Sequence, residues 1–260
     1  MTSQLFMEER RRIILDQLRQ LGRVSVNNLS ELLNVSAVTI RQDLKSLEAD
    51  GLLERTHGGA VERDPNRVVQ SELSFDIRRA KNFAEKEALG RAAAAMVKDG
   101  YGIAIDASST ACSLVQYLGD IDGLTVVTNS IIVTEQLLGN IRAEVILPGG
   151  RLRRDSVSLI GSPQTLPDVN LNIGFVSAWG ITREAAMTEV SSEETEMKRA
   201  LLNLCLTKVV LVDSSKWGQV APYTYAKFNE IDKIITTDNV PEEVLREYES
   251  LALNLEVITL

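Results

Sequence analysis

The 260-residue sequence predicts an α/β protein in which a small N-terminal domain precedes a larger, mostly parallel α/β domain. Three observations lead to this class. Residues 1–61 contain three helical patterns followed by a short hairpin pattern. Residues 62–74 begin as a polar stretch with a proline at position 65, which is typical of a linker. From residue 75 to residue 260, strand patterns alternate with helical ones, which indicates a parallel sheet with right-handed crossovers.

The first helical pattern covers residues 8–21 and ends at Gly22, a residue that commonly stops a helix. Its apolar side chains share one face: Ile14, Leu18 and Leu21. Ser25 is suited to cap the N-terminus of a second, shorter helix. That helix also has one apolar face: Val26, Leu29 and Leu33. A tight connection at residues 34–35 then leads to the third helix.

The third helix is predicted to begin after the N-cap Ser36 and to end at Gly51. Its inward stripe has helical spacing: Ile40, Leu44 and Leu47. Its opposite side carries Val38, Arg41, Gln42 and Lys45. Near the N-terminus of the helix, Thr39, Arg41 and Gln42 suit contacts with base edges, and Lys45 suits a phosphate. The alternative is an ordinary amphipathic surface helix.

Residues 52–61 predict a β-hairpin, because two short strand patterns flank the pair Gly58 and Gly59. A hairpin after three helices makes the domain a winged helix-turn-helix. Arg55 and His57 at the tip would touch the DNA backbone or the minor groove, while a solvated turn residue is the alternative for His57. The predicted DNA-contacting residues are Ser25, Ser36, Val38, Thr39, Arg41, Gln42, Lys45, Arg55, His57 and Gly58.

Charge by itself does not reveal a nucleic-acid-binding protein. The formal net charge is −8, and residues 1–62 carry eight Lys and Arg against nine Asp and Glu. The DNA-binding prediction therefore rests on where the charges fall. A single histidine, His57, excludes a multi-histidine metal site and argues against histidine-based catalysis.

The two cysteines, Cys112 and Cys205, lie far apart in segments with helical patterns, and we expect buried thiols. No CxxC pair suggests zinc, so neither a metal nor a cofactor is predicted. No apolar run reaches the length of a membrane span, and the charged stretch at 8–12 does not fit a signal peptide. We therefore expect a soluble, cytoplasmic protein.

The ordered motifs of the N-terminal domain resemble the signature of DeoR-type transcriptional regulators. The matching positions are 24–26, 29, 32, 35–36, 39–44, 47–48, 51–52 and 55–60. Gln42 stands where this family usually has a second arginine, so the operator sequence stays open.

The larger domain is predicted to start with one long helical stretch at residues 75–98. The expected strands are 102–105, 124–128, 144–147, 173–178, 209–212 and 233–236. The expected helices between or after them are 110–118, 131–138, 193–206 and 242–249. Ligands of parallel sheets bind at the carboxyl ends of the strands, so the residues that follow each strand are the candidates for a site.

Four of these strand ends carry small, hydroxyl, amide or glycine residues. They are residues 106–110, 128–130, 148–150 and 213–216, the last with a lysine. Hydroxyls and backbone N–H groups at helix N-termini suit a phosphate or a sugar. The same residue types also serve as ordinary caps and turns. The four ends together favour a small polar ligand.

The resemblance to DeoR-type regulators continues through this domain, at Phe75, Arg78, Asn82, Lys86, the Asp106 loop, 127–130, Gly149, Gly150, Gly161 and 213–216. It implies an effector domain similar in fold to ribose-5-phosphate isomerases, which senses phosphorylated sugars or related metabolites. Carried over by position, the pocket residues would be Asp106, Ser108, Ser109, Thr110, Thr128, Asn129, Ser130, Gly149, Gly150 and Lys216. Lys216 would supply positive charge, and Asp106 would accept sugar hydroxyls.

Three features depart from the pattern of the family. Ser108 stands where glycine is common, Trp179 is larger than expected, and a second glycine is missing after residues 180–181. These departures predict an atypical ligand or a degenerate pocket. The nearby arginines at 151, 153 and 154 are expected to form a solvated loop, with contacts to effector or subunit as alternatives.

The sequence thus predicts a DNA-binding regulator, a repressor of carbohydrate-metabolism genes that responds to a phosphorylated metabolite. A winged helix needs a second copy for useful specificity, so we expect a homodimer or homotetramer. One alternative is a sugar-phosphate isomerase using Asp106, Glu189 or Asp213 as bases and Lys216 as the stabilising cation. Another is a domain whose wing binds a protein instead of DNA.

Overall fold

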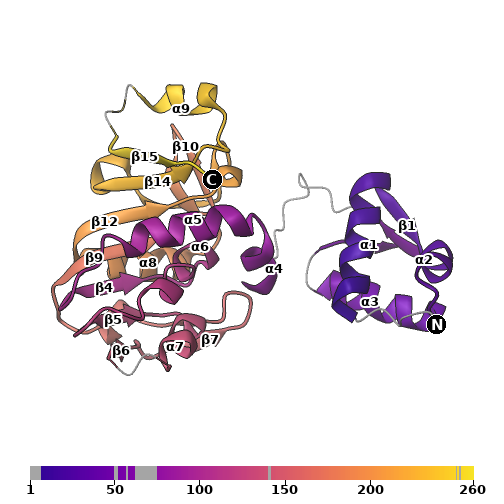
Figure 1. Ribbon diagram of the computed structural model, residues 1–260, viewed down its shortest axis with the longest axis horizontal. Coiled ribbons are helices and arrows are strands. Elements are labelled where there is room, and N and C mark those ends of the chain that lie inside the picture. Colours follow the sequence, from indigo (N-terminus) through magenta and orange to yellow (C-terminus); the bar gives the residue numbers. More distant parts are fainter. Residues whose placement is uncertain are drawn as a thin grey trace. The chain divides into compact units, whose positions relative to one another are not determined.

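The structure, a computed structural model, describes residues 7–49, 52–56, 58–61, 75–139, 142–249, 251 and 253–260. The chain divides into two compact units, Met1–Ser74 and Phe75–Leu260 (Figure 1). Each unit has a hydrophobic core of its own. The predicted linker at 62–74, His57 and the predicted helix end at Gly51 lie outside the described residues.

The N-terminal unit combines three helices with a small antiparallel sheet. Its elements are α1 (Met7–Leu21), β1 (Arg23–Ser25), α2 (Val26–Leu33), α3 (Ala37–Ala49), β2 (Glu54–Thr56) and β3 (Gly59–Val61). The strands are ordered β1-β3-β2. The three helices and the hairpin are as predicted. The strand β1 was not predicted, because three residues between two helices give too short a pattern to read.

The core of this unit lies between α1, α2 and α3. Ile40, Leu44 and Leu47 are at most 2% exposed, so the predicted inward stripe of α3 is confirmed. Ile14 and Leu18 of α1 are buried in the same cluster. Leu21 was expected beside them but is 64% exposed. It is the last residue of α1, and the buried stripe ends one turn earlier.

The wing depends on a glycine. A Cβ atom at Gly59 would lie 2.0 Å from the carbonyl oxygen of Val24, because β3 passes close to β1. The backbone N–H of Val26 also donates to the carbonyl of Gly58 (2.8 Å). These contacts tie the wing to the start of α2.

The second unit is built on a seven-stranded parallel sheet ordered β15-β14-β12-β9-β4-β5-β6. Its strands are β4 (Gly102–Ile105), β5 (Thr125–Thr128), β6 (Glu144–Ile146), β9 (Leu171–Val176), β12 (Cys205–Leu211), β14 (Lys233–Thr237) and β15 (Leu255–Ile258). Six of them were predicted, and β15 was missed. Since all seven are parallel, their carboxyl ends lie at one edge.

Helices cover both faces of this sheet. They are α4 (Phe75–Ala80), α5 (Phe83–Ala94), α6 (Ser109–Cys112), α7 (Ile131–Leu137), α8 (Ser192–Asn203), α9 (Glu242–Glu249) and short 3-10 turns η1 (Val115–Tyr117), η2 (Pro163–Thr165), η3 (Ser214–Lys216) and η4 (Phe228–Glu230). In Figure 1, α5 and α6 lie in front of the sheet and α8 lies behind it. Lys198 on α8 therefore approaches the sheet from the opposite side to Lys86 on α5.

Two antiparallel elements that were not predicted flank the main sheet. One is the hairpin of β7 (Arg151–Arg153) and β8 (Ser158–Ile160). The other is the sheet of β10 (Gly180–Thr182), β11 (Ala186–Glu189) and β13 (Tyr223–Ala226). Their strands have three or four residues each and mix polar with apolar side chains, so they lack the apolar runs that mark β4 and β5. The missing glycine falls here, and Ala186 takes a left-handed φ of 56° in its place.

The predicted long helix at 75–98 is wrong, because it is broken between α4 and α5. Asn82 adopts a left-handed conformation (φ 53°) at the break. The ammonium group of Lys86 donates to the carbonyl of Arg78 and to that of Lys81 (2.6 Å). These carbonyls close α4 and would otherwise lack helical partners. A buried lysine thus satisfies the end of one helix from the next.

Two other helix predictions need correction. The expected helix at 110–118 is α6 followed by η1, and the expected helix at 193–206 ends at Asn203. Cys205 begins β12, where it pairs with Leu171 of β9. Strand pairing there prevails over the local helical pattern. Both cysteines are buried. Among the described residues, no helix is long and apolar enough to cross a membrane.

Candidate DNA-binding surface and strand-end site

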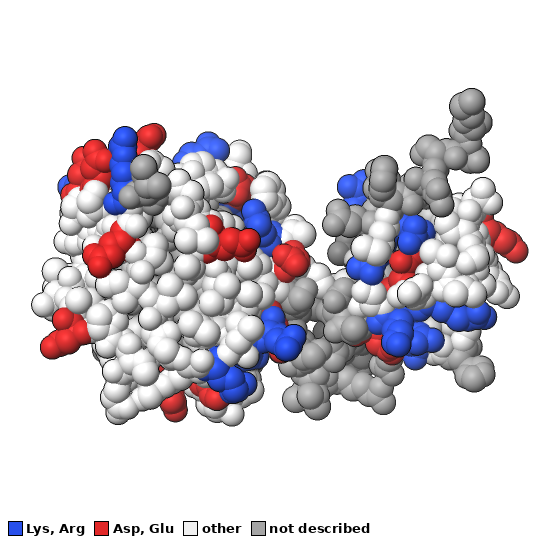
Figure 2. All heavy atoms as spheres, turned by 90° about the horizontal axis from the view of Figure 1, so that it is seen from below, with Lys and Arg blue, Asp and Glu red and all other residues white. Residues whose placement is uncertain are grey.

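The outer face of α3 presents the side chains that the sequence assigned to DNA. Val38 is 67% exposed, Arg41, Gln42 and Lys45 are exposed, and Thr39 is half-buried. Figure 2 views this unit from the side of α3, and Lys and Arg side chains gather across it. The face thus offers cations and an amide to an incoming groove.

Ser36 and Ser25 act as helix caps. The Oγ of Ser36 accepts from the backbone N–H of Thr39 (3.1 Å), and the Oγ of Ser25 accepts from that of Asn28 (3.1 Å). Both hydroxyls therefore fix the starts of α3 and α2. Arg55 is exposed on β2, with its guanidinium 3.9 Å from the carboxylate of Glu48. Gly58 lies at the turn with φ 102°.

A buried ion pair that the sequence analysis missed fixes α3 against α1. The Nε of Arg10 lies 2.5 Å from Oδ2 of Asp43, and its Nη2 donates to Oδ1 at 3.1 Å. The side chains of Arg10 and Asp43 are 11% and 5% exposed. The hydrogen bond from Arg10 to Asp43 is the main cause of the raised pKa of that arginine. The pairing of two charged residues 33 positions apart leaves no local pattern in the sequence.

At the end of β4, Asp106 is buried and surrounded by donors. Its Oδ1 accepts from the backbone N–H (3.0 Å) and Oγ (2.5 Å) of Ser108, and its Oδ2 accepts from the N–H of Ser177 (3.1 Å). The Nζ of Lys198 lies 3.1 Å from Oδ2. These donors leave the carboxylate little capacity to accept sugar hydroxyls. The Oγ of Ser108 also caps α6 through the N–H of Ala111 (3.1 Å).

Lys198, on α8, is the central cation of this cluster and was not singled out from the sequence. Its Nζ donates to Oε2 of Glu189 (2.7 Å) and to the carbonyl of Ser177 (2.6 Å), and it lies 4.8 Å from the ring centroid of Tyr225. Burial disfavours the charged form of both Lys198 and Glu189. Their mutual attraction prevails, so the pKa of Lys198 is raised and that of Glu189 is lowered.

The loop after β5 is tied to the β7–β8 hairpin. Thr128 Oγ1 accepts from the N–H of Ser130 (3.1 Å), and Ser130 Oγ caps α7 through Val133 (3.2 Å). The amide of Asn129 donates to the carbonyl of Leu159 (3.3 Å). Ser109 and Thr110, in the first turn of α6, are both buried. Because β4 and β5 are parallel neighbours, the loops that follow them lie side by side at the same edge of the sheet.

Gly149 and Gly150 are exposed at the base of the same hairpin. A Cβ atom at Gly150 would lie 2.5 Å from the carbonyl oxygen of Ile160. Of the three arginines beyond them, two face α8: Arg151 lies 3.0 Å from Glu193, and Arg153 lies 3.7 Å from Glu194. This pairing with α8 was not among the alternatives considered for the arginine cluster.

A second charged group forms where η3 meets the junction of α4 and α5. Oδ1 of Asp213 accepts from the amide of Asn82 (2.9 Å) and from Oγ (2.5 Å) of Ser215. Burial lowers the pKa of Lys216, and it lowers that of Lys86 to about 8. The charges of Lys81 and Arg78 lower both values further, that of Lys216 also lowers the pKa of Lys86, and Asp213 opposes the shift of both lysines. Several cations thus crowd around one aspartate.

Four buried polar atoms of uncharged side chains have no hydrogen-bond partner among the described residues. They are Oδ1 of Asn129, Oγ of Ser177, Oγ1 of Thr195 and the hydroxyl of Tyr225. Asn129 and Ser177 follow β5 and β9, on either side of β4 in the sheet. A buried polar atom is costly unless something binds it. Among the described residues, no group of three or more His, Cys, Asp or Glu side chains could hold a metal ion.

Comparison with known proteins assigns each unit to a family of domains. Residues 10–65 match the DeoR-like helix-turn-helix domain, and residues 81–238 match the DeoR C terminal sensor domain. The transcriptional regulator GolR of Listeria innocua is 33% identical over 97% of this chain and 99% of its own. The transcriptional repressor GlcR of Bacillus subtilis is 33% identical over 92% of this chain and 91% of its own.

Among solved structures, ribose 5-phosphate isomerase A of Methanocaldococcus jannaschii is similar over 53% of this chain and 55% of its own, with 17% identity and a TM-score of 0.40. The relatives that match over almost their whole length are regulators of transcription.

Proposed function

The chain belongs to the DeoR family of transcriptional regulators. On that basis we propose that it represses its target genes until a phosphorylated sugar or related metabolite binds the strand-end site, which is formed by the polar residues that follow the strands of the parallel sheet. α3 would read an operator through Arg41 and Gln42, with Lys45 on a phosphate. The matching relatives are regulators, so the isomerase alternative has no support beyond a partial likeness of fold.

The crowded cations support the class of ligand most directly. Lys81 and Arg78 disfavour the positive charge of Lys86 and of Lys216, and Asp213 is the carboxylate that chiefly opposes this effect. A phosphate dianion there would relieve this repulsion and pair with both buried lysines. We therefore place the phosphate of the ligand at this group, with Lys216 as a direct contact.

The unpartnered polar atoms support a ligand that also carries hydroxyl groups. Asn129 Oδ1 accepts hydrogen bonds, and the hydroxyls of Ser177 and Tyr225 both donate and accept. Asp106, whose oxygens are already occupied, would hold Ser108 and Lys198 in place instead of binding the sugar. The remaining predicted contacts would be Ser109, Thr110, Thr128, Ser130, Gly149 and Gly150.

Regulation would follow from linkage. A ligand that binds more tightly to the conformation with weak operator affinity shifts the protein toward that conformation. Ligand and operator then weaken each other's binding by the same coupling free energy. Two or more copies would be needed to reach useful specificity, so we propose a homodimer or homotetramer. Because the operator is genomic DNA, we propose that the protein acts in the cytoplasm.

We expect Arg41→Ala to weaken operator binding by about 1–3 kcal/mol per subunit, since it removes a side chain suited to a base edge. The measurement is a mobility-shift titration on a fragment from the gene's own upstream region, with competitor DNA and at several salt concentrations. Arg12→Ala, an exposed arginine on α1, is the matched control. An unchanged footprint for Arg41→Ala would remove Arg41 from the interface. Affinity independent of salt would instead favour a protein partner for this unit.

We expect Lys216→Ala to leave operator binding intact and to raise by about tenfold or more the sugar-phosphate concentration that releases the operator. A thermal-shift screen with pentose and hexose phosphates identifies the ligand first. Lys216 is preferred to Lys86 for this test, because Lys86 also holds the end of α4. Lys98→Ala, at an exposed lysine in the same unit, is the control. An undiminished response in Lys216→Ala would show that the phosphate is bound elsewhere.

A further inference from the structure

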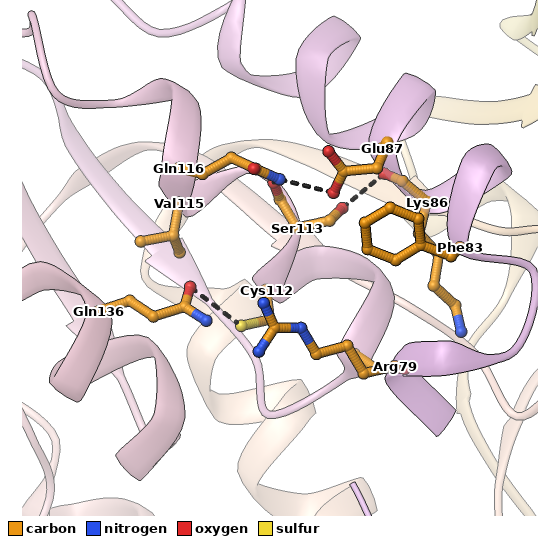
Figure 3. A pocket seen from close by; sticks show the side chains of 10 residues that line it. Arg79, Phe83, Lys86, Glu87, Cys112, Ser113, Val115, Gln116 and Gln136 are labelled. Carbon is orange, nitrogen blue, oxygen red and sulfur yellow. Dashed lines mark hydrogen bonds between the residues drawn. The ribbon is translucent and has the colours of Figure 1, made fainter. Parts of the chain in front are cut away.

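A pocket of about 310 Å³ opens in the second unit, residues 75–260, which is called the sensor unit from here on. It lies between α4 and α5 on one side and α6, η1 and α7 on the other (Figure 3). Its volume is at the lower end of the range for small-molecule sites. Only Lys86 and Ser109 are shared with the residues discussed for the strand-end site. The other lining residues come from α4, α5, η1, α7 and the segment of α6.

Most of the polar groups in this pocket are already hydrogen-bonded. The carboxylate of Glu87 accepts from the amide of Gln116 (2.6 Å) and from the hydroxyl of Tyr117 (2.9 Å). The thiol of Cys112 donates to Oε1 of Gln136 (3.6 Å). The ammonium group of Lys86 is directed to the carbonyls that end α4. The carboxylate is thus satisfied by neutral donors and is poorly placed to recruit a cation.

Two donors in the pocket remain. The guanidinium of Arg79 and the side-chain amide of Gln136 are both exposed, and neither donates a hydrogen bond to another residue in the part of the chain that the structure describes. Figure 3 shows the Arg79 guanidinium extending across the pocket to the side of Cys112 and Gln136. Burial raises the pKa of Cys112 to about 12, so the thiol brings no negative charge that would neutralise this arginine. The charge that is left unsatisfied in the pocket is positive.

The pocket also has an apolar wall. The ring of Phe83 is 53% exposed although it lies on a helix whose neighbouring surface positions are polar or small. Val115 and Cys112 add buried apolar surface. An exposed aromatic ring beside a guanidinium is suited to a ligand with a planar or apolar body and one anionic end.

We propose that this pocket is a second small-molecule site, which takes an organic carboxylate with an aromatic or compact apolar body. The carboxylate binds Arg79 and Gln136, and the apolar body packs on Phe83 and Val115. A bound carboxylate links Arg79 of α4 to Gln136 of α7, and so holds α4, the first described helix after residues 62–74, against α6 and α7. This site meets the strand-end site only at Lys86 and Ser109, and the four residues proposed here to contact its ligand are not among those of the strand-end site.

The test uses the full chain and ligand-observed fluorine NMR with three probes. They are 4-fluorobenzoate, its neutral analogue 4-fluorobenzamide, and trifluoroacetate, which is an anion without a ring. We expect saturable binding of 4-fluorobenzoate, with at least about tenfold weaker binding of the other two. Equal affinities for 4-fluorobenzoate and 4-fluorobenzamide would overturn the proposed role of the charge.

Variants locate the site. Arg79→Met and Phe83→Ala should each weaken 4-fluorobenzoate binding by about tenfold without lowering the melting temperature, since both side chains are exposed. Arg142→Met, at an exposed arginine of the same unit, should bind as the unmodified chain does. Unchanged affinity in Arg79→Met would overturn the proposal. So would competitive displacement of 4-fluorobenzoate by ribose 5-phosphate or glucose 6-phosphate, because the pocket would then belong to the strand-end site.

Discussion

Lys198→Met is expected to lower the free energy of unfolding of the sensor unit by about 3–5 kcal/mol, because it leaves buried carboxylates without their cation. The Nζ of Lys198 lies 2.7 Å from Glu189 and 3.1 Å from Asp106, and all three side chains are at most 8% exposed. Methionine has a similar shape, so a packing defect contributes little. Urea unfolding followed by circular dichroism gives the free energy.

The dependence of this loss on pH identifies its electrostatic cause. In the unmodified chain the pKa of Glu189 is lowered, so its contribution to stability is present above the unfolded pKa of about 4.3 and falls as the pH drops through the folded value. Without Lys198, burial raises the pKa of Glu189 above the unfolded value, and protonation then stabilises the fold. The stability gap between the two proteins should therefore narrow as the pH falls from 7 to 5.

Lys98→Met is the matched control, because Lys98 is exposed. It should change the free energy of unfolding by less than about 0.5 kcal/mol. A Lys198→Met variant with normal stability at pH 7, or with a gap that widens on acidification, would contradict the assigned role of the buried lysine.

Asp43→Ala is expected to destabilise the N-terminal unit by about 3–5 kcal/mol, because it leaves the guanidinium of Arg10 buried without its carboxylate. Since Asp43 fixes α3 against α1, operator binding should be lost together with folding of this unit. Arg41→Ala is expected to differ, because it weakens binding with the fold intact. Thermal unfolding and mobility shifts on the same samples separate the two effects.

A double variant keeps this second prediction testable if Asp43→Ala fails to fold. Replacing both partners, Arg10→Met with Asp43→Leu, removes both charges of the buried pair and should recover most of the lost stability. Glu48→Ala, at an exposed acid of the same helix, should have little effect. If the double variant is destabilised as much as Asp43→Ala, the loss of stability comes from altered packing and not from the buried charge.

Much of the fold could be predicted because it is written in local periodicity. The spacing of Ile40, Leu44 and Leu47 decides which side of α3 is buried, and Arg41 and Lys45 are exposed as a consequence. The six predicted parallel strands are mostly apolar runs that alternate with helical patterns, and this makes them recognisable. The strands β7, β8, β10, β11 and β13 mix polar and apolar residues over three or four positions, and β13 pairs with β11 across a long sequence separation.

The strand-end site was only partly predictable for the same reason. Asp106 and Asn129 follow β4 and β5 directly, and Lys216 lies in the short turn after β12, so topology alone brings them to one edge of the sheet. Lys198 and Tyr225 come from a helix and a strand that carry no recognisable motif. They join the site because α8 and β13 pack there.

The sequence by itself determined the two-domain α/β class, the exposed face of α3 and the polar strand ends, because helix and strand periods and the parallel order depend on neighbouring residues. The tertiary structure alone decided the break at Asn82, the burial of Arg10 with Asp43, and the position of Lys198 between two carboxylates. A buried charge is tolerated only where distant segments supply its partner, and that partner is fixed by packing and not by local pattern.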